Sequence, residues 1–290
     1  MNHPHIITIA SEKGGVGKTT LAINLAIYLK ALREEIPVTI LSFDNHFSVD
    51  RLFRIGNHSP VGNVSHLFAP APPQDLATLG EFGISFIPSQ GALDPAALGI
   101  DGVHKLAEGL KKTGLTGFVI IDTRPILDIF TQNALYAADQ VIIPVKDLPA
   151  LENAADIYAF YDLYRLPRKR LRILPSLVDM RIRFPGPFRN TFELLRAYAI
   201  KCGYRCFEGF ISKSPKVESL NTNPQGKIFP VLIHGRGTEV HHQYTSLARQ
   251  VIQRACGAEP RNSPPAEQAP QPPEKAENAP RPLLSGSHPD

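Results

Sequence analysis

A glycine-rich segment that contains two lysines is the part of this sequence best equipped to do chemistry. Residues 13–20 read KGGVGKTT and follow directly on an apolar run, IITIA. Gly14, Gly15 and Gly17 carry no side chains, so successive backbone N–H groups can converge on phosphate oxygens. A helix that opens near Thr19 would point its positive N-terminus at the same charge. The pattern therefore predicts a phosphate loop for a nucleotide.

The other residues of this loop have distinct expected roles. Lys18 would neutralise the β- and γ-phosphates of ATP, and the Thr19 hydroxyl would ligate Mg²⁺. Val16 and Thr20 are further expected nucleotide-binding residues of this loop. Lys13 stands five positions before the P-loop lysine and is unnecessary for a simple phosphate cradle. Its presence indicates a second task for the loop.

The segment SEKGGVGKTT resembles the deviant Walker A motif of the ParA/MinD family of partition and positioning ATPases. In that family the lysine that matches Lys13 reaches across a nucleotide-sandwich dimer to the phosphates of the partner. The resemblance implies that Lys13 couples ATP binding to homodimerisation and acts in catalysis together with Lys18. It also implies slow ATP hydrolysis that a partner protein accelerates and that times a cycle between monomer and dimer.

Two further segments extend the resemblance. VTILSFDNHFSVD is similar to the family's strand that ends in Asp-x-Asp, and it supplies Asp44 as the residue that positions the attacking water. FVIIDTRP is similar to the family's Walker B stretch and supplies Asp122, which would bind Mg²⁺ through a water. Ser42 replaces the first acid of the earlier segment, and Arg124 replaces a proline of the later one. These two departures leave the rate of hydrolysis open.

A fourth segment, GFISKSPKVESL, resembles the part of the family fold that approaches the adenine base. On that alignment Ser212 and Pro215 lie near the base. The pattern of the closing helix also matches, so the resemblance covers roughly residues 5–256.

Short apolar runs alternate along the chain with helix-length amphipathic segments. This alternation predicts an α/β fold with a mainly parallel sheet covered by helices on both faces. The resemblance implies that this fold is of the P-loop NTPase type. The expected strands are Ile6–Ala10, Val38–Phe43, Ile84–Ile87, Phe118–Ile121, Val141–Val145, Leu171–Val178 and Phe207–Ile211. The expected helices are Thr19–Leu32, Pro95–Lys112, Leu127–Ala138, Pro149–Leu163, Gly186–Cys202 and Thr238–Arg254.

Positive charge is concentrated in the C-terminal half. Residues 151–256 carry 17 Lys and Arg against 8 Asp and Glu, although the net charge of the whole chain is only +4. Such asymmetry favours a polyanionic partner, and phosphate contacts need only positive charge at reachable spacing. ParA-type members bind DNA non-specifically as ATP-bound dimers, so the resemblance implies DNA as this partner. The expected DNA-binding residues are Arg168, Lys169, Arg170, Arg181, Arg183 and Arg189.

Two alternatives to a DNA-bound ATPase stay open. MinD-type members bind membrane through a terminal amphipathic helix, which this sequence lacks, so membrane binding is not expected. A nucleotide-switched scaffold that binds ATP but barely hydrolyses it would account for Ser42 and Arg124. For the ATPase that binds DNA, the expected output is the segregation or positioning of DNA or another large cargo.

Length and composition set the remaining bounds. With 290 residues, of which 43% are hydrophobic, the chain can form one large α/β domain, expected at residues 1–256. Residues 257–290 are rich in Pro, Ala and Glu, cannot bury enough apolar surface, and are expected to be a disordered tail. The sequence has no apolar stretch of about 18 residues and no signal-peptide pattern, so we expect a cytoplasmic protein, associated with the nucleoid when bound to DNA.

Overall fold

The computed structural model describes residues 3–44, 48–56, 62–89, 91, 93–221 and 229–257. The expected tail lies outside the described residues from position 258 onward, so its disorder stays a prediction. No helix in the described ranges is long and apolar enough to cross a bilayer.

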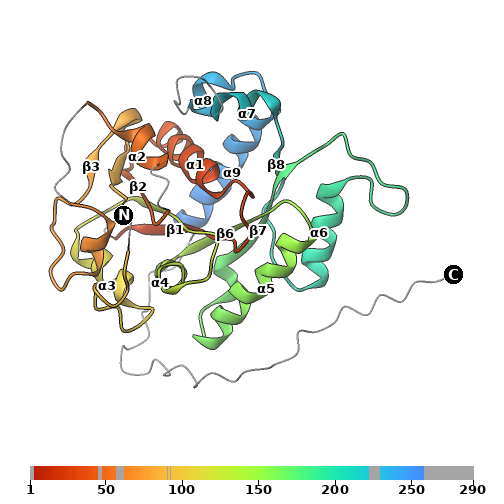
Figure 1. Ribbon diagram of the computed structural model, residues 1–290. Coiled ribbons are helices and arrows are strands. Elements are labelled where there is room, and N and C mark those ends of the chain that lie inside the picture. The colour runs from red at the N-terminus through yellow and green to blue at the C-terminus, as the bar shows by residue number, and fades with distance from the viewer. Residues whose placement is uncertain are drawn as a thin grey trace. The chain divides into compact units, whose positions relative to one another are not determined.

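An eight-stranded sheet is the frame of the described part of the chain (Figure 1). Its strand order is β3-β4-β2-β5-β1-β6-β7-β8, and neighbours run parallel except for β3, which is antiparallel to β4. The prediction of a mainly parallel sheet is therefore confirmed. The strands are β1 (His5–Ile9), β2 (Val38–Ser42), β3 (Thr78–Leu79), β4 (Ser85–Ile87), β5 (Phe118–Asp122), β6 (Gln140–Val145), β7 (Leu171–Val178) and β8 (Ile211–Ser212).

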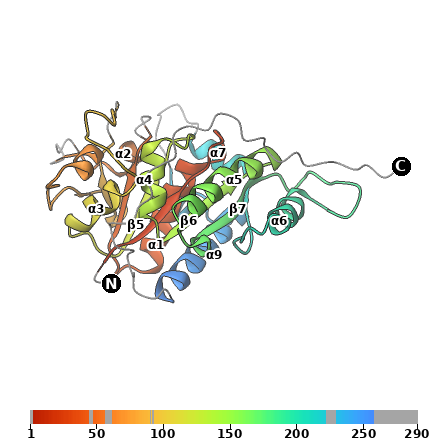
Figure 2. The ribbon, with the colours of Figure 1, turned by 90° about the horizontal axis from the view of Figure 1, so that it is seen from below.

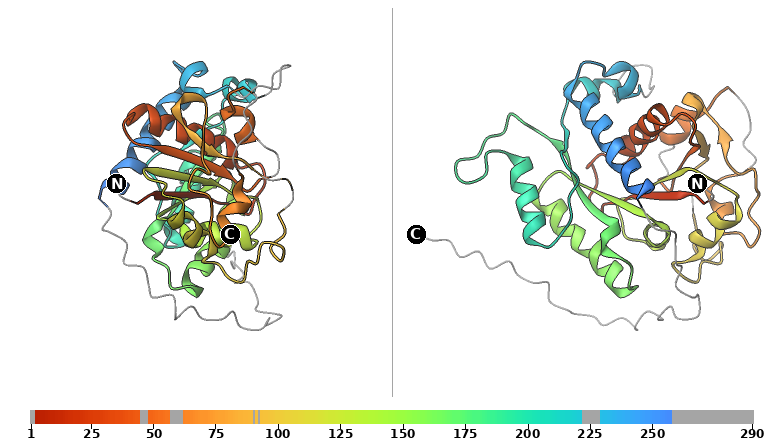
Figure 3. Two further views of the ribbon diagram at one scale, coloured as in Figure 1. Left: turned by 90° about the vertical axis from the view of Figure 1, so that its left-hand side faces the viewer. Right: turned by 180° about the vertical axis from the view of Figure 1, so that it is seen from behind.

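Helices cover both faces of this sheet, with α1 and α9 on one face and α4, α5 and α6 on the other (Figures 1 and 2). The view from behind shows α9 running alongside α1 (Figure 3). The α-helices are α1 (Lys18–Leu32), α2 (Ser48–Phe53), α3 (Lys105–Lys112), α4 (Ile129–Ala137), α5 (Leu148–Leu163), α6 (Thr191–Lys201), α7 (Pro215–Asn221), α8 (Val231–His234) and α9 (Glu239–Cys256). Short 3₁₀ turns are η1 (Val64–Phe68), η2 (Glu81–Gly83) and η3 (Arg168–Arg170).

The apolar runs are continuous because each central strand is buried on both faces. In β5, Phe118 and Ile120 pack into the core beneath α1 and α9, whereas Val119 and Ile121 pack beneath α3 and α4. All four side chains have no measurable exposure to solvent. The two-residue alternation of strand side chains thus fills both layers from one short segment.

Three expected elements differ from the structure. The helix expected at Gly186–Cys202 begins only at Thr191, after its N-cap Asn190. The helix expected at Pro95–Lys112 begins only at Lys105, because the chain turns at Gly99, which has φ = +61°, and reaches α3 through a second glycine, Gly102. The strand expected at Phe207–Ile211 is reduced to Ile211–Ser212. There Gly209, at φ = +88°, bends the chain away from the extended conformation.

The parallel arrangement brings several strand ends to one edge of the sheet. β1 lies at the centre of the sheet, between β5 and β6. After β1 the chain crosses to β2 on the β5 side of the sheet, whereas after β5 it crosses to β6 on the other side of β1. A change of direction of this kind opens a crevice at the carboxyl ends of the strands, where ligands of open α/β sheets bind.

Candidate functional site

The predicted phosphate loop connects β1 to α1 at this crevice. Gly15 and Gly17 have φ values of +67° and +85°, which favour glycine over any L side chain. Gly17 is the N-cap of α1, and no side chain caps the helix. The first-turn N–H groups of a 15-residue helix thus face the crevice without a side-chain acceptor. This is the arrangement that binds phosphate at helix N-termini.

Lys18 lies inside the loop. Only 7% of the residue is exposed, and its Nζ donates a hydrogen bond of 3.2 Å to the carbonyl oxygen of Lys13. Burial lowers the pKa of Lys18, while the nearby carboxylates of Asp122 and Asp44 act in the opposite direction. The ammonium is therefore directed at the concave side of its own loop, as its predicted contact with the β- and γ-phosphates requires.

Asp122 ends β5 and holds two hydroxyl groups. Its Oδ2 accepts hydrogen bonds from Thr19 Oγ1 at 2.8 Å and from Ser42 Oγ at 2.9 Å. The β2–β5 register places Ser42 directly beside Asp122, so the residue that replaces the family's acid contacts the other carboxylate. Asp122 Oδ1 is buried and has no hydrogen-bond partner in the described part of the chain.

This arrangement fits a hydrated magnesium ion. Mg²⁺ keeps several waters and binds through one or two protein oxygens, and a buried carboxylate oxygen without a donor can accept from such a water. Thr19 Oγ1 and Asp122 are the residues that would hold the ion, as the sequence predicted. Burial raises the pKa of Asp122 to about 7, against the lowering effect of the hydrogen bonds from Thr19 and Ser42.

Asp44 lies in the same group of charges. It follows β2, and its backbone N–H donates to Ser42 Oγ at 3.1 Å. Its negative charge contributes to the raised pKa of Asp122 and opposes the lowered pKa of Lys18. The structure thus brings Asp44, Lys18 and Asp122 together, and the role of Asp44 in positioning water stays a prediction.

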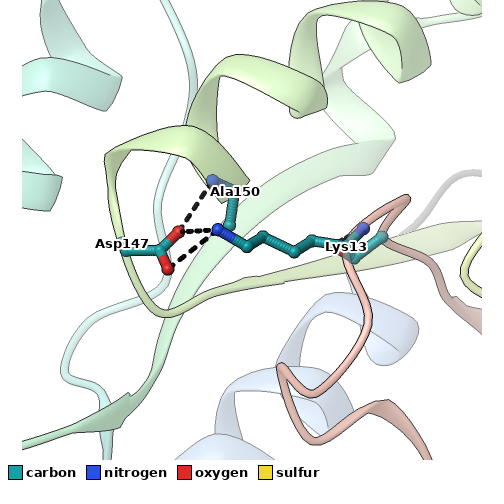
Figure 4. Close-up of polar contacts among 4 residues, drawn as sticks. Lys13, Asp147 and Ala150 are labelled. Carbon is teal, nitrogen blue, oxygen red and sulfur yellow. Dashed lines mark hydrogen bonds and ion pairs between the residues drawn. The ribbon is translucent and has the colours of Figure 1, made fainter.

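Lys13 is directed away from its own phosphate loop (Figure 4). Its Nζ lies 3.0 Å from both carboxylate oxygens of Asp147, which directly precedes α5. Asp147 is the N-cap of α5 and also accepts a hydrogen bond of 2.9 Å from the backbone N–H of Ala150. Burial acts to raise the pKa of Asp147, but the bonds from Lys13 and Ala150 outweigh it, and the pKa is lowered. The sequence argument missed Asp147, although an acid placed two residues before Pro149 is a recognisable helix-start signal.

Arg124 is held in a similar way. Its Nη2 lies 2.5 Å from Oδ2 of Asp128, the N-cap of α4, whose Oδ1 accepts from the backbone N–H of Thr131. The guanidinium also lies over the Phe130 ring, with Cζ 4.9 Å from the ring centroid. The extra charge of Arg124 is therefore bound at the start of α4, a contact that the sequence argument also missed.

β7 has an irregularity beside the phosphate loop. Leu177 has φ = +54°, and the β7–β8 register shifts between Ser176 and Val178. A Cβ atom at Gly17 would lie 3.6 Å from Leu177 Cδ1, so the leucine side chain faces the loop. A bulge turns a side chain out of the regular alternation, here at a cost of roughly 1–2 kcal/mol for the left-handed conformation. The structure thus adds Leu177 to the walls of the site.

The predicted adenine contacts lie on β8 and α7. The backbone N–H and Oγ of Ser212 donate to Oε1 of Gln243 on α9, at 2.8 Å and 3.1 Å. Pro215 is exposed and begins α7. Among the described residues, no hydrogen bond joins either of them to the phosphate loop, so their contact with the base stays a prediction.

The six predicted DNA-binding residues form two separate groups. The strand-start cluster, Arg168, Lys169 and Arg170, is the 3₁₀ turn η3 that precedes β7. The loop cluster, Arg181, Arg183 and Arg189, follows β7 on a segment that projects from the body of the fold between β7 and α6 (Figures 1 and 3). The eight residues of β7 separate the two clusters by roughly 25 Å.

Two of these arginines are already paired. Arg168 Nε donates to Asp162 Oδ1 at 2.6 Å, and Arg181 donates to both oxygens of Asp179 at 2.9 and 2.6 Å. The bonds from Arg181 hold the pKa of Asp179 well below its ordinary value. Of the two clusters, only the loop cluster lies at the same edge of the sheet as the phosphate loop.

The chain is similar to known nucleotide-binding and partitioning proteins. A family model described as the CobQ/CobB/MinD/ParA nucleotide binding domain matches residues 7–155. The chromosome partitioning protein ParA of Caulobacter vibrioides is 27% identical over 270 residues, which covers 87% of this chain and 96% of the relative. The chromosome-partitioning ATPase Soj of Thermus thermophilus is 34% identical over 177 residues, which covers 60% of this chain and 68% of the relative.

The fold is also similar to solved structures. Cobyrinic acid a,c-diamide synthase from Mycobacterium smegmatis, with bound ATP analog and magnesium, superposes with a TM-score of 0.66 at 19% identity, covering 87% of this chain and 96% of that chain. Residues 7–155, which match the family model, include the phosphate loop, Asp44 and Asp122. Both basic clusters lie outside this range.

Raising the pH should destabilise the protein through Asp122 when nucleotide and metal are absent. Between the ordinary pKa of the unfolded carboxyl and the folded value of about 7, the folded state holds a proton that the unfolded state has lost, so stability falls as pH rises. From pH 5 to pH 7 we expect the free energy of unfolding to fall by about 2 kcal/mol relative to Asp122→Asn, which has no proton to lose. Urea unfolding of both proteins in EDTA checks this, and parallel pH curves would contradict it.

Proposed function

This chain belongs to the CobQ/CobB/MinD/ParA family of nucleotide-binding domains, and from that membership we propose that it is a ParA-like ATPase that dimerises with ATP. Its output would be the positioning or segregation of DNA or another large cargo. One observation carries the proposal: of the two loop lysines, Lys18 is directed into the phosphate loop, whereas Lys13 is held outside it by Asp147. A loop that served only its own nucleotide would have no use for the second lysine.

Different residues of the site would contact the phosphates, the magnesium ion and the attacking water. The N–H groups of the loop and the N-terminus of α1 bind the phosphates, and Lys18 exchanges the Lys13 carbonyl for phosphate oxygen. Mg²⁺, when bound, would supply positive charge that offsets the negative charge of the phosphates. Thr19 and Asp122 would hold it, and Asp44 would orient the water that attacks the γ-phosphate.

Dimerisation would use Lys13 as the contact in trans. In the monomer its ammonium already has an anionic partner, Asp147, so the lysine is not left as an isolated charge. In the ATP-bound dimer Lys13 would exchange this carboxylate for the phosphates of the partner subunit. ATP then favours the dimer because it supplies the anion that the exchange requires.

DNA binding is proposed for the loop cluster of Arg181, Arg183 and Arg189. These residues are exposed, lie on a projecting segment, and follow the same edge of the sheet as the phosphate loop. Pairing two subunits doubles the number of phosphate contacts, so affinity for DNA rises when ATP joins the subunits. In that state the protein would be associated with the nucleoid.

A weakly hydrolysing scaffold is the second candidate, and one observation favours it. Ser42 Oγ donates to Asp122 Oδ2, so a neutral hydroxyl, in place of the family's acid, lies beside the carboxylate that would bind Mg²⁺. A site with one charge fewer holds Mg²⁺ and the transition-state charge less strongly.

Removing Lys13 and releasing Lys13 should have opposite effects on assembly. We expect Lys13→Ala to remain monomeric with ATP. Asp147→Asn keeps a good N-cap for α5 but removes the ion pair, so it should dimerise at protein concentrations up to about fivefold lower than wild type. Gel filtration with light scattering, with ATP and with ADP, checks both variants. Normal ATP-dependent dimerisation of Lys13→Ala would refute the sandwich mechanism.

Loss of Asp44 should trap the ATP-bound state. Asp44→Ala removes the carboxylate that orients water, so we expect turnover to fall by at least about 100-fold while the dimer accumulates. Single-turnover hydrolysis, measured alongside gel filtration, checks this. If wild type is as slow as Asp44→Ala, with or without DNA, the protein is the scaffold and not a working ATPase.

The two basic clusters should contribute unequally to DNA binding. Replacing Arg181, Arg183 and Arg189 together by Ala should weaken binding of random-sequence DNA by roughly 10- to 100-fold with ATP present and reduce its salt dependence. The matched control replaces Arg168, Lys169 and Arg170 by Ala and should have a smaller effect. Equal losses from both variants would show that DNA binding is not confined to the nucleotide edge of the sheet.

A further inference from the structure

A third lysine lies against the phosphate loop, and no family motif or sequence argument pointed to it. Lys146 directly follows β6 and precedes the cap residue Asp147. A Cβ atom added at Gly15 would lie 3.6 Å from Lys146 Nζ. Since Gly15 belongs to the predicted cradle, this ammonium lies within reach of the space where phosphates would bind.

The three lysines at the loop differ in their partners. Lys13 is paired with Asp147, and Lys18 donates to the carbonyl oxygen of Lys13. Lys146 is only half-buried, and within the described ranges it has neither an ion pair nor a side-chain hydrogen bond. Its charge lowers the pKa of the neighbouring Asp147, whose carboxylate is nevertheless bound to Lys13. Among the described residues, no carboxylate is bound to this cation beside the predicted phosphate loop.

We propose that Lys146 is a phosphate-binding residue that acts in cis, on the nucleotide held by its own subunit. This inference rests on the proposed binding of ATP at the loop. The chain before α5 then has two adjacent residues with opposite tasks. Asp147 binds Lys13, the lysine that would contact the partner subunit. Lys146 supplies positive charge to the nucleotide while Lys13 is bound to Asp147. The monomer can therefore hold ATP before a second subunit arrives.

The decisive measurement uses the Lys13→Ala background, in which any contact in trans is removed. Binding of Mg²⁺ with the non-hydrolysable analogue AMPPNP is measured by calorimetry for this protein and for versions that also carry Lys146→Gln, Lys146→Arg or Lys111→Gln. Lys146→Gln should bind about tenfold more weakly, because a hydrogen bond to a charged group is lost. Lys146→Arg should restore most of the affinity, and Lys111→Gln, which removes an exposed charge on α3, should change nothing.

Salt dependence separates a phosphate contact from a structural role. If Lys146 binds phosphate, its loss should flatten the decline of affinity between 50 and 300 mM salt. An unchanged affinity in Lys146→Gln, an unchanged salt slope, or failure of Lys146→Arg to restore binding would overturn the proposal. Failure of the protein with Lys146 intact to bind AMPPNP, or unchanged binding after Lys18→Ala, would instead refute the proposed nucleotide function itself.

Discussion

Parallel pairing at the centre of the sheet is the constraint on which the rest of the structure depends. Because β1, β2, β5 and β6 run in one direction, their carboxyl ends meet at a single edge. The register of β2 with β5 then sets Ser42 beside Asp122, and the first turn of α1 adds Thr19 to the same carboxylate. No local sequence preference could bring these residues together. The site exists because the strands are aligned, and the buried apolar side chains on both faces keep them aligned.

At the same edge of the sheet, two aspartates at helix N-termini bind basic side chains. Asp128 and Asp147 each cap a helix and each bind a cation, Arg124 and Lys13 respectively. A carboxylate at a helix N-terminus is stabilised by the helix dipole whether or not a cation is present. Each aspartate also accepts a hydrogen bond from the first turn of its helix, so it keeps a partner if its cation leaves. For Asp147 this suits the proposed exchange of Lys13.

The sequence predicted the parts of the site that depend on short-range patterns. The phosphate loop is encoded within eight residues, and Asp44 and Asp122 were predicted because the segments that contain them resemble family motifs at the ends of apolar strands. The pairing of Lys13 with Asp147 was missed because 134 residues separate them and the contact depends on β1 lying beside β6. The charge count predicted an excess of arginine in the C-terminal half, but it could not reveal that the clusters lie at opposite ends of β7. Helix limits were wrong where glycines such as Gly99 interrupt an amphipathic pattern.

The contact between Lys13 and Asp147 has a consequence for the timing of the cycle. Ala150 and the start of α5 hold Asp147 in place independently of Lys13, so exchange of the lysine requires no movement of the backbone. What changes is the rotamer of one side chain that is about a third exposed, and such changes take picoseconds to nanoseconds. Release of Lys13 is therefore far too fast to limit turnover in the proposed cycle. The slow steps of that cycle would be those that break the phosphate bond, release the product or separate the two subunits.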